Sequence, residues 1–192
     1  QVARLFGVEV ANASMYDGST AAWEAVAMAA RVTKRKKAVL CSGLHPHYVS
    51  TIRTMAKFTG DVIEWAAPRL EAEPDTAGVI AAIDGETSCV MVQYPDILGR
   101  VTDLSAIAEA AHSVGALLVA VVTEPVALGL LEAPGNLGAD IVLHSTTKYI
   151  GGHSDVVGGA LVTNSEELDT KFAFIQNGAG GVPGPFDAYL TM

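Results

Sequence analysis

The chain has 192 residues, 50% of them hydrophobic, with a formal net charge of −9 and only two cysteines. A chain of this length suits one domain that buries a sizeable core. The negative charge excludes nucleic acid as a principal partner, and no apolar run is long enough to span a membrane. The cysteines lie in apolar surroundings and the first residues lack a signal-peptide pattern, so we expect buried free thiols in a cytoplasmic protein.

Apolar, strand-like stretches alternate with helical stretches along the whole chain. The strands are apolar throughout, which is typical of an α/β fold with a mostly parallel sheet and helices on both faces. The glycine pair at 158–159 indicates that the last strand pair turns antiparallel. We expect helices at 17–33, 46–58, 76–83, 104–114 and 166–176, and strands at 37–41, 61–65, 87–94, 116–122, 141–143 and 157–163.

One segment, HSTTKY at 144–149, combines a lysine with hydroxyl residues. Lys148 lies just beyond a strand-like stretch, and Ser145 and Thr147 lie three and one positions before it. A lysine amine can attach an aldehyde cofactor covalently, and hydroxyl groups can bind a phosphate. The cofactor pyridoxal phosphate (PLP) requires both a lysine for covalent attachment and groups that bind its phosphate. The alternative is a solvated loop lysine among turn residues.

The surroundings of this lysine resemble a known family. The stretch GADIVLHSTTKYIGGHSDVVGG at 138–159, followed by NGAG at 177–180 and PGPFD at 183–187, is similar to the PLP enzymes of Cys/Met metabolism, the cystathionine γ-synthase family. We assign this resemblance to residues 142–192. It implies that Lys148 carries PLP as an internal aldimine and that Ser145 and Thr147 contact the phosphate.

The longer first part of the chain resembles a different family. Residues 1–141 are similar to the glycine dehydrogenase (decarboxylating) P-protein, especially its first subunit. The motifs are ANASMYDGSTA at 11–21, RVTKR at 31–35, HPHY at 45–48 and EPVALGLL at 124–131. Both families share the aspartate-aminotransferase-like fold, fold type I. The resemblances imply that residues 1–192 form one large domain of this fold without its small domain, and they suggest a chimera joined near 138–142.

Several residues could bind the cofactor at the carboxyl ends of the strands, where sites in such sheets lie. Gly18, Ser19 and Thr20 open the first helix, whose N–H groups and dipole suit a phosphate, although a plain helix cap is the alternative. His45 could stack on the pyridine ring, as in the P-protein family, or could be an ordinary loop histidine. Asp96 could approach the ring oxygen, or it could be a turn residue.

The partner of the pyridine nitrogen is the weakest element of this site. Enzymes of the family place an aspartate at the end of the strand before the lysine strand, where it keeps the ring nitrogen protonated. Here that strand ends at Thr123 and Glu124, so one of these residues substitutes or the role is empty. The spacing of the His, Cys, Asp and Glu residues predicts no metal site.

Three functions remain open from the sequence. The first is a PLP-dependent enzyme or subunit that resembles the glycine decarboxylase of the glycine cleavage system, an oxidoreductase. It would act on glycine with a partner P-protein subunit and a lipoyl carrier protein, within a homo- or hetero-oligomer such as a dimer. The second is a trans-sulfuration-type C–S lyase or synthase that acts on a sulfur amino acid. The third is a non-catalytic subunit or isolated domain.

Overall fold

The computed structural model describes residues 1–191, and it describes the side chains of all of them except residues 13, 14 and 179. Met192, the last residue of the predicted domain, lies outside the described residues. The helices are α1 (Val2–Leu5), α2 (Gly18–Thr33), α3 (Pro46–Thr59), α4 (Thr76–Ala82), α5 (Ser105–Ser113), α6 (Glu166–Ala179) and α7 (Pro185–Thr191), with 3-10 turns η1 (Pro125–Gly129) and η2 (Pro134–Leu137). The strands are β1 (Val10–Met15), β2 (Lys37–Leu40), β3 (Val62–Trp65), β4 (Thr87–Gln93), β5 (Leu117–Val122), β6 (Ile141–His144) and β7 (Gly159–Thr163).

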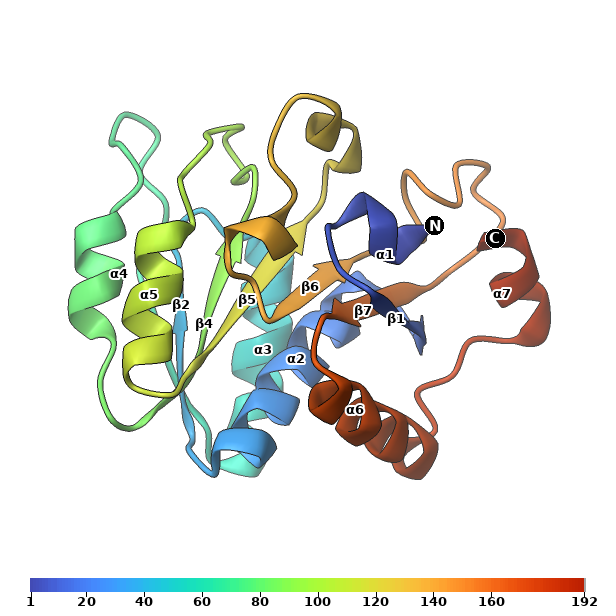
Figure 1. The fold of residues 1–192 in the computed structure, drawn as a ribbon, viewed down its shortest axis with the longest axis horizontal. Coiled ribbons are helices and arrows are strands. Elements are labelled where there is room, and N and C mark those ends of the chain that lie inside the picture. The colour runs from blue at the N-terminus through green and yellow to red at the C-terminus, as the bar shows by residue number, and fades with distance from the viewer. Residues whose placement is uncertain (192) are drawn as a thin grey trace.

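The strands form one sheet in the order β1-β7-β6-β5-β4-β2-β3 (Figure 1). The pairs β2–β3, β2–β4, β4–β5 and β5–β6 are parallel. The pairs β6–β7 and β1–β7 are antiparallel. The prediction of a mostly parallel α/β sheet with an antiparallel last pair is therefore confirmed. Because four consecutive pairs are parallel, the loops that follow β2, β4, β5 and β6 leave the sheet at one edge.

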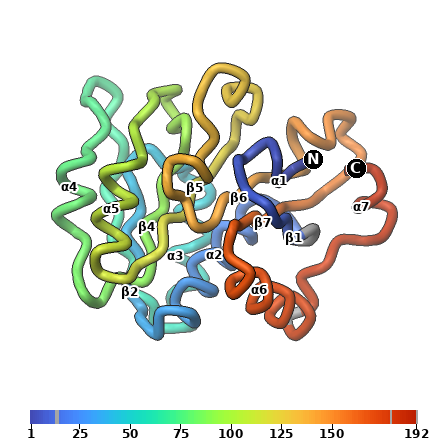
Figure 2. Tube along the Cα trace, viewed as in Figure 1, coloured from blue at the N-terminus to red at the C-terminus, as the bar shows by residue number. Residues whose placement is uncertain are grey.

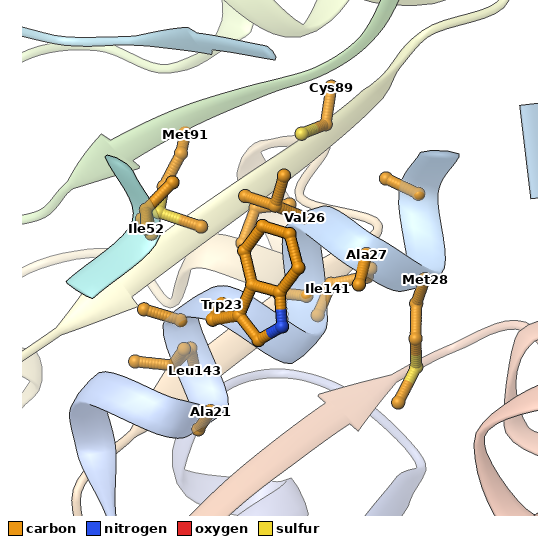
Figure 3. Close-up of a cluster of buried hydrophobic side chains, with 14 of the residues drawn as sticks. Ala21, Trp23, Val26, Ala27, Met28, Ile52, Cys89, Met91, Ile141 and Leu143 are labelled. Carbon is orange, nitrogen blue, oxygen red and sulfur yellow. The ribbon is translucent and has the colours of Figure 1, made fainter. Parts of the chain in front are cut away.

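Helices cover both faces of the sheet (Figure 1). On one face α2, α3 and α6 pack over a core that includes alanines and Trp23 of α2 together with Ile141 and Leu143 of β6 (Figure 3). On the other face α4, α5 and α1 cover a second apolar cluster, to which Phe6 and Ile107 belong. The small alanine side chains of α2 let this helix lie close to the centre of the sheet.

The predicted join lies in a strand that is fully integrated into the sheet. Asp140, just before β6, accepts a hydrogen bond from the backbone N–H of Leu118 at 2.7 Å and pairs with His112 Nε2 at 2.8 Å. Its own carbonyl accepts a hydrogen bond from the hydroxyl of Thr163. These contacts connect β6 to both of its neighbours, β5 and β7, and they fix its register.

The sequence did not predict α1, β1 or α7. The strand β1 has small and polar residues where an alternating apolar pattern would be expected, so it resembles a loop. It is stabilised as an edge strand by its antiparallel pairing with β7. The expected strand at 157–163 begins only at Gly159, because Gly158 forms hydrogen bonds with the side chain of Thr147 before the sheet starts.

Cys41 and Cys89 are buried and unpaired, as the sequence predicted. Burial raises the pKa of each thiol to about 12, so both behave as apolar core residues. Within the described part of the chain, no helix is both long and apolar enough to cross a membrane.

Leu143→Ala tests the packing of β6. Leu143 is completely buried, so the truncation should lower the free energy of unfolding by about 2–5 kcal/mol. Leu130→Ala is the matched control, because Leu130 is 95% exposed and its truncation should change stability by less than about 0.5 kcal/mol. Urea unfolding measures both values. Equal effects of the two substitutions would contradict the burial of Leu143 in the core.

Candidate functional site

A cleft of about 1190 Å³ lies at the carboxyl edge of the parallel strands. Figure 2 shows that the loops after β4 and β5 project from the same edge of the sheet. Eight of the nine predicted site residues line this cleft: Gly18, Ser19, His45, Asp96, Glu124, Ser145, Thr147 and Lys148. The ninth, Thr20, lines a smaller cavity of about 210 Å³ instead. The structure therefore brings together residues that are far apart in the sequence.

Lys148 is exposed within this cleft. The apolar stretch before Lys148 predicts an amine buried among apolar neighbours, and its exposure shows that this prediction is wrong. The physical reason is the turn that follows β6: the N–H of Lys148 donates to Ser145 O, and the N–H of Gly152 donates to Lys148 O. This tight turn carries the side chain away from the sheet and leaves the amine accessible to a molecule in the cleft.

Gly18, Ser145 and Tyr48 meet at one end of the cleft. A Cβ atom on Gly18 would lie 2.6 Å from Ser145 Cβ and 2.3 Å from the hydroxyl oxygen of Tyr48, so only glycine fits. Ser145 is buried, and its side chain forms a hydrogen bond with Tyr48. Burial raises the pKa of Tyr48, which keeps its hydroxyl protonated. Two hydroxyl groups thus lie beside the first turn of α2.

Tyr48 lines the cleft although its sequence context does not single it out. A tyrosine near a helix start has no distinctive pattern, and such residues usually cover a helix face. The signal that could have found it is its position in the first turn of α3, two residues after Pro46. Side chains in that turn point toward the same edge of the sheet as the loop before the helix.

A carboxylate caps the first turn of α2. Asp17 Oδ1 accepts hydrogen bonds from the N–H of Thr20 and from the hydroxyl of Ser19, both at 2.8 Å. The N–H of Asp17 donates to Thr20 Oγ1, which completes a capping box. Burial alone would raise the pKa of Asp17, but these hydrogen bonds outweigh it and the pKa is lowered. Two of the groups predicted to bind a phosphate, the Ser19 hydroxyl and the Thr20 N–H, therefore donate to Asp17 instead.

Thr147 is also engaged by the protein. Its hydroxyl accepts a hydrogen bond from the N–H of Gly158 at 2.8 Å and donates to the carbonyl of the same residue at 3.1 Å. This double contact closes the loop that carries Lys148. The observed role of Thr147 is thus to hold the two ends of this loop together.

A chain of hydrogen bonds crosses the floor of the cleft. The backbone N–H of His45 donates to Gln93 Oε1 at 2.9 Å, and Gln93 Nε2 donates to Thr123 Oγ1 at 3.1 Å. Gln93 was not predicted, although a glutamine that ends an otherwise apolar strand is a signal that could have found it. His45 Nδ1 accepts from the N–H of His47, and burial, followed by the nearby His47, lowers the pKa of His45.

The two predicted carboxylates occupy different surroundings. Asp96 forms a turn, since it accepts hydrogen bonds from the N–H groups of Leu98 and Arg100. It also forms an ion pair with the Arg100 guanidinium at 2.7 Å. Glu124 is exposed at the rim of the cleft. Among the described residues, no group of three or more His, Cys, Asp or Glu side chains could hold a metal ion.

His144 connects the two strands that carry Thr123 and Ser145. Its Nδ1 lies 2.7 Å from the carbonyl oxygen of Val122, so Nδ1 carries the proton. The side chain is almost fully buried beside the ring of Phe6, and Nε2 has no hydrogen-bond partner among the described residues. Burial lowers the pKa of His144, although the Val122 carbonyl and Glu124 act in the opposite direction.

Comparison with known proteins identifies the family. A family model described as the glycine cleavage system P-protein matches residues 1–153. The chain belongs to this family.

The similarity of this P-protein chain to individual relatives is high over most of its length. It is 70% identical over 143 residues to a protein named probable glycine dehydrogenase (decarboxylating) subunit 1, from Novosphingobium aromaticivorans. That match covers 74% of the chain and 32% of the relative. The chain thus spans about a third of the length of the curated relatives that it matches.

Solved structures resemble the P-protein chain over a longer range. A crystal structure of glycine decarboxylase (P-protein) of the glycine cleavage system, in inhibitor-bound form, is 36% identical with a TM-score of 0.75, and the match covers 88% of this chain and 37% of that one. Cystathionine gamma-lyase from Lactobacillus plantarum, complexed with L-serine, is 28% identical with a TM-score of 0.79 and covers 99% of this chain and 47% of its own. Both families suspected from the sequence are therefore found among the neighbours.

The cap of α2 in this P-protein chain should depend on pH. The pKa of Asp17 is lowered in the folded state, so its stabilisation is complete above the ordinary value of 3.8 and is lost as the pH falls through the folded pKa. Asp17→Ala should lower stability by about 1 kcal/mol near neutral pH. Asp17→Asn keeps a capping oxygen, so it should cost less and should flatten the acid dependence. Urea unfolding between pH 3 and 7 measures this, and equal acid slopes in all three proteins would contradict it.

His144 should contribute a second pH dependence to the P-protein chain. Its pKa is lowered on folding, so the unfolded chain takes up the proton first as the pH falls below the ordinary value of 6.5. Stability should therefore decrease from that pH until the folded pKa is reached. His144→Asn removes the titrating group and should reduce this slope, whatever its cost at neutral pH. Unfolding free energies between pH 5 and 7.5 provide the comparison, and an unchanged slope would refute the assignment.

Proposed function

We propose that this chain is the cofactor-binding large-domain region of a glycine decarboxylase P-protein subunit, with Lys148 as the attachment point for PLP. The observation that carries the proposal is the shared cleft: in a chain of the P-protein family, an accessible lysine and the Gly18 turn line one cavity. The domain would extend over residues 1–192, with the join between family resemblances near 138–142.

The cleft residues fit PLP at its aldehyde and phosphate ends. Gly18 leaves a space that a Cβ atom would fill, beside the hydroxyl groups of Ser145 and Tyr48. These groups would hold the phosphate, and the exposed amine of Lys148 would take the aldehyde. When bound, PLP supplies a ring that accepts electron density from the α-carbon of an amino acid. Asp17 opposes the phosphate electrostatically, so Ser19 and Thr20 would contribute only where the cap opens.

The remaining residues would position the substrate side of the site. His45 is held as the N-cap of α3, with its Nδ1 unprotonated, and lines the cleft beside Gln93. It would bound the ring on one face, as the family resemblance implies. Asp96 would act through the turn it builds, because its charge is already paired with Arg100. Lys148 would also serve in the cleft as a group that can move a proton to or from the substrate.

The names of the relatives support the proposal that this chain is part of a multisubunit assembly. They are named subunit 1, which implies a second subunit, and the chain covers about a third of their length. We therefore propose glycine as the substrate class, a partner P-protein subunit that completes the site, and a lipoyl carrier protein as the acceptor of the aminomethyl group, in the cytoplasm.

A trans-sulfuration-type C–S lyase or synthase is the second candidate. The specific observation in its favour is that a cystathionine gamma-lyase structure matches 99% of the chain, including the segment after residue 153 that the P-protein model does not cover. The two candidates differ in substrate: glycine for the first, and cysteine or an activated homoserine for the second.

Lys148 should form a covalent adduct with PLP. Purified chain mixed with PLP should develop visible absorbance, and borohydride reduction followed by peptide mapping should place the label on Lys148. Lys148→Ala should abolish the labelled peptide. Lys171→Ala is the matched control, because Lys171 lies on α6 and pairs with Glu167.

Substrate addition to the same adduct separates the candidates. A spectral change with glycine but not with cysteine or activated homoserine supports the P-protein assignment, and the reverse supports the lyase. Absence of any adduct in folded protein would reject PLP attachment and leave the non-catalytic subunit as the surviving function.

A further inference from the structure

The floor of the cleft carries a hydroxyl whose proton has no acceptor among the described residues. The backbone N–H of His45 can only donate, so the atom of Gln93 that receives it must be Oε1. Gln93 therefore presents its amide nitrogen to Thr123, whose hydroxyl accepts that hydrogen bond. The hydroxyl proton of Thr123 must then point elsewhere, and within residues 1–191 it donates to no acceptor. Thr123 is half-buried and lines the cleft.

The hydrogen-bonding partner of this hydroxyl is neutral, because neither Gln93 nor Thr123 carries a charge. Two of the carboxylates that line the cleft are engaged by other groups: Asp17 caps α2, and Asp96 forms an ion pair with Arg100. Glu124 also lines the cleft, but it is exposed at the rim, where water screens its charge.

A neutral cleft floor with a hydrogen-bond donor favours a ligand atom that is uncharged and can accept a hydrogen bond. A protonated aromatic nitrogen is a cation with an N–H to donate, and it is favoured by a nearby carboxylate. Without such a carboxylate, a partly desolvated cation loses its proton. An unprotonated aromatic nitrogen is instead a hydrogen-bond acceptor, which matches the free proton of Thr123.

We propose that Thr123, oriented by Gln93, donates a hydrogen bond into the cleft and makes the site selective for an unprotonated aromatic nitrogen. This inference rests on the proposed function, for which that atom is the ring nitrogen of PLP. A neutral ring withdraws electron density less strongly than a protonated one. The chain would therefore hold the cofactor firmly and stabilise a carbanion weakly. Thr123 is a positioning residue for the ring, and Gln93 sets its direction.

The test is the protonation state of the ring nitrogen in the complex. The chain is loaded with PLP that carries ¹⁵N in the ring, and the ¹⁵N chemical shift is followed between pH 6 and 8. We expect the signal of an unprotonated nitrogen throughout. Thr123→Asp supplies a carboxylate and should move the signal to that of the protonated form. A protonated nitrogen in the unsubstituted chain would overturn the inference.

Two further variants allow the inference to be tested even if Thr123→Asp does not fold. Thr123→Val keeps the shape but removes the donor, so PLP affinity should fall about tenfold while the nitrogen stays unprotonated. Thr51→Val on α3, outside the cleft, is the matched control and should change neither quantity. Unchanged affinity in Thr123→Val would refute the role of the hydroxyl. If no PLP complex forms at all, the proposed function fails too, whereas a complex with a protonated nitrogen rejects only this inference.

Discussion

The close approach of three segments at Gly18 is the constraint on which the site depends. The first turn of α2, the first turn of α3 and the loop after β6 meet where a single Cβ atom would collide with Ser145 and Tyr48. Any larger residue at position 18 would push the β6 loop away from α2. The cavity between Lys148 and the helix start would then lose its shape. A backbone requirement at one residue thus sets the geometry of a site assembled from distant parts of the chain.

The sheet makes this meeting possible. Four parallel pairs bring the ends of β2, β4, β5 and β6 to one edge, and each contributes a polar residue there: His45, Gln93, Thr123 and Ser145. The hydrogen bonds that run from His45 through Gln93 to Thr123 tie three of these strand ends together. The fourth strand end, that of β6, is joined to the others by His144, whose imidazole forms a hydrogen bond with the carbonyl of Val122 at the end of β5.

The sequence predicted the central part of the fold because its strands are wholly apolar and its helices have clear beginnings. The helix at α2 was expected from residue 17, and Asp17 is its cap. The edges were less predictable: β1 has no alternating pattern and exists through its pairing with β7. In the site, the types and spacing of the residues indicated which side chains to consider, but they did not indicate which groups these side chains contact. Ser145 and Lys148 were found from their spacing, whereas the exposure of Lys148 follows from a turn that no spacing encodes.

Under the proposed function, the two ends of the cleft differ in what they provide for the cofactor. Attachment requires only an accessible amine and hydroxyl donors, and Lys148, Ser145 and Tyr48 provide these without any buried charge. A protonated ring stabilises a carbanion more strongly than a neutral ring, and a carboxylate beside the ring nitrogen favours that protonation. The structure places a neutral amide–hydroxyl pair at the cleft floor instead, engages Asp17 in a helix cap and Asp96 in an ion pair, and leaves Glu124 exposed at the rim. Under the proposed function, anchoring and electron withdrawal are therefore separable properties of this fold, and a partner subunit with its own floor could supply the second.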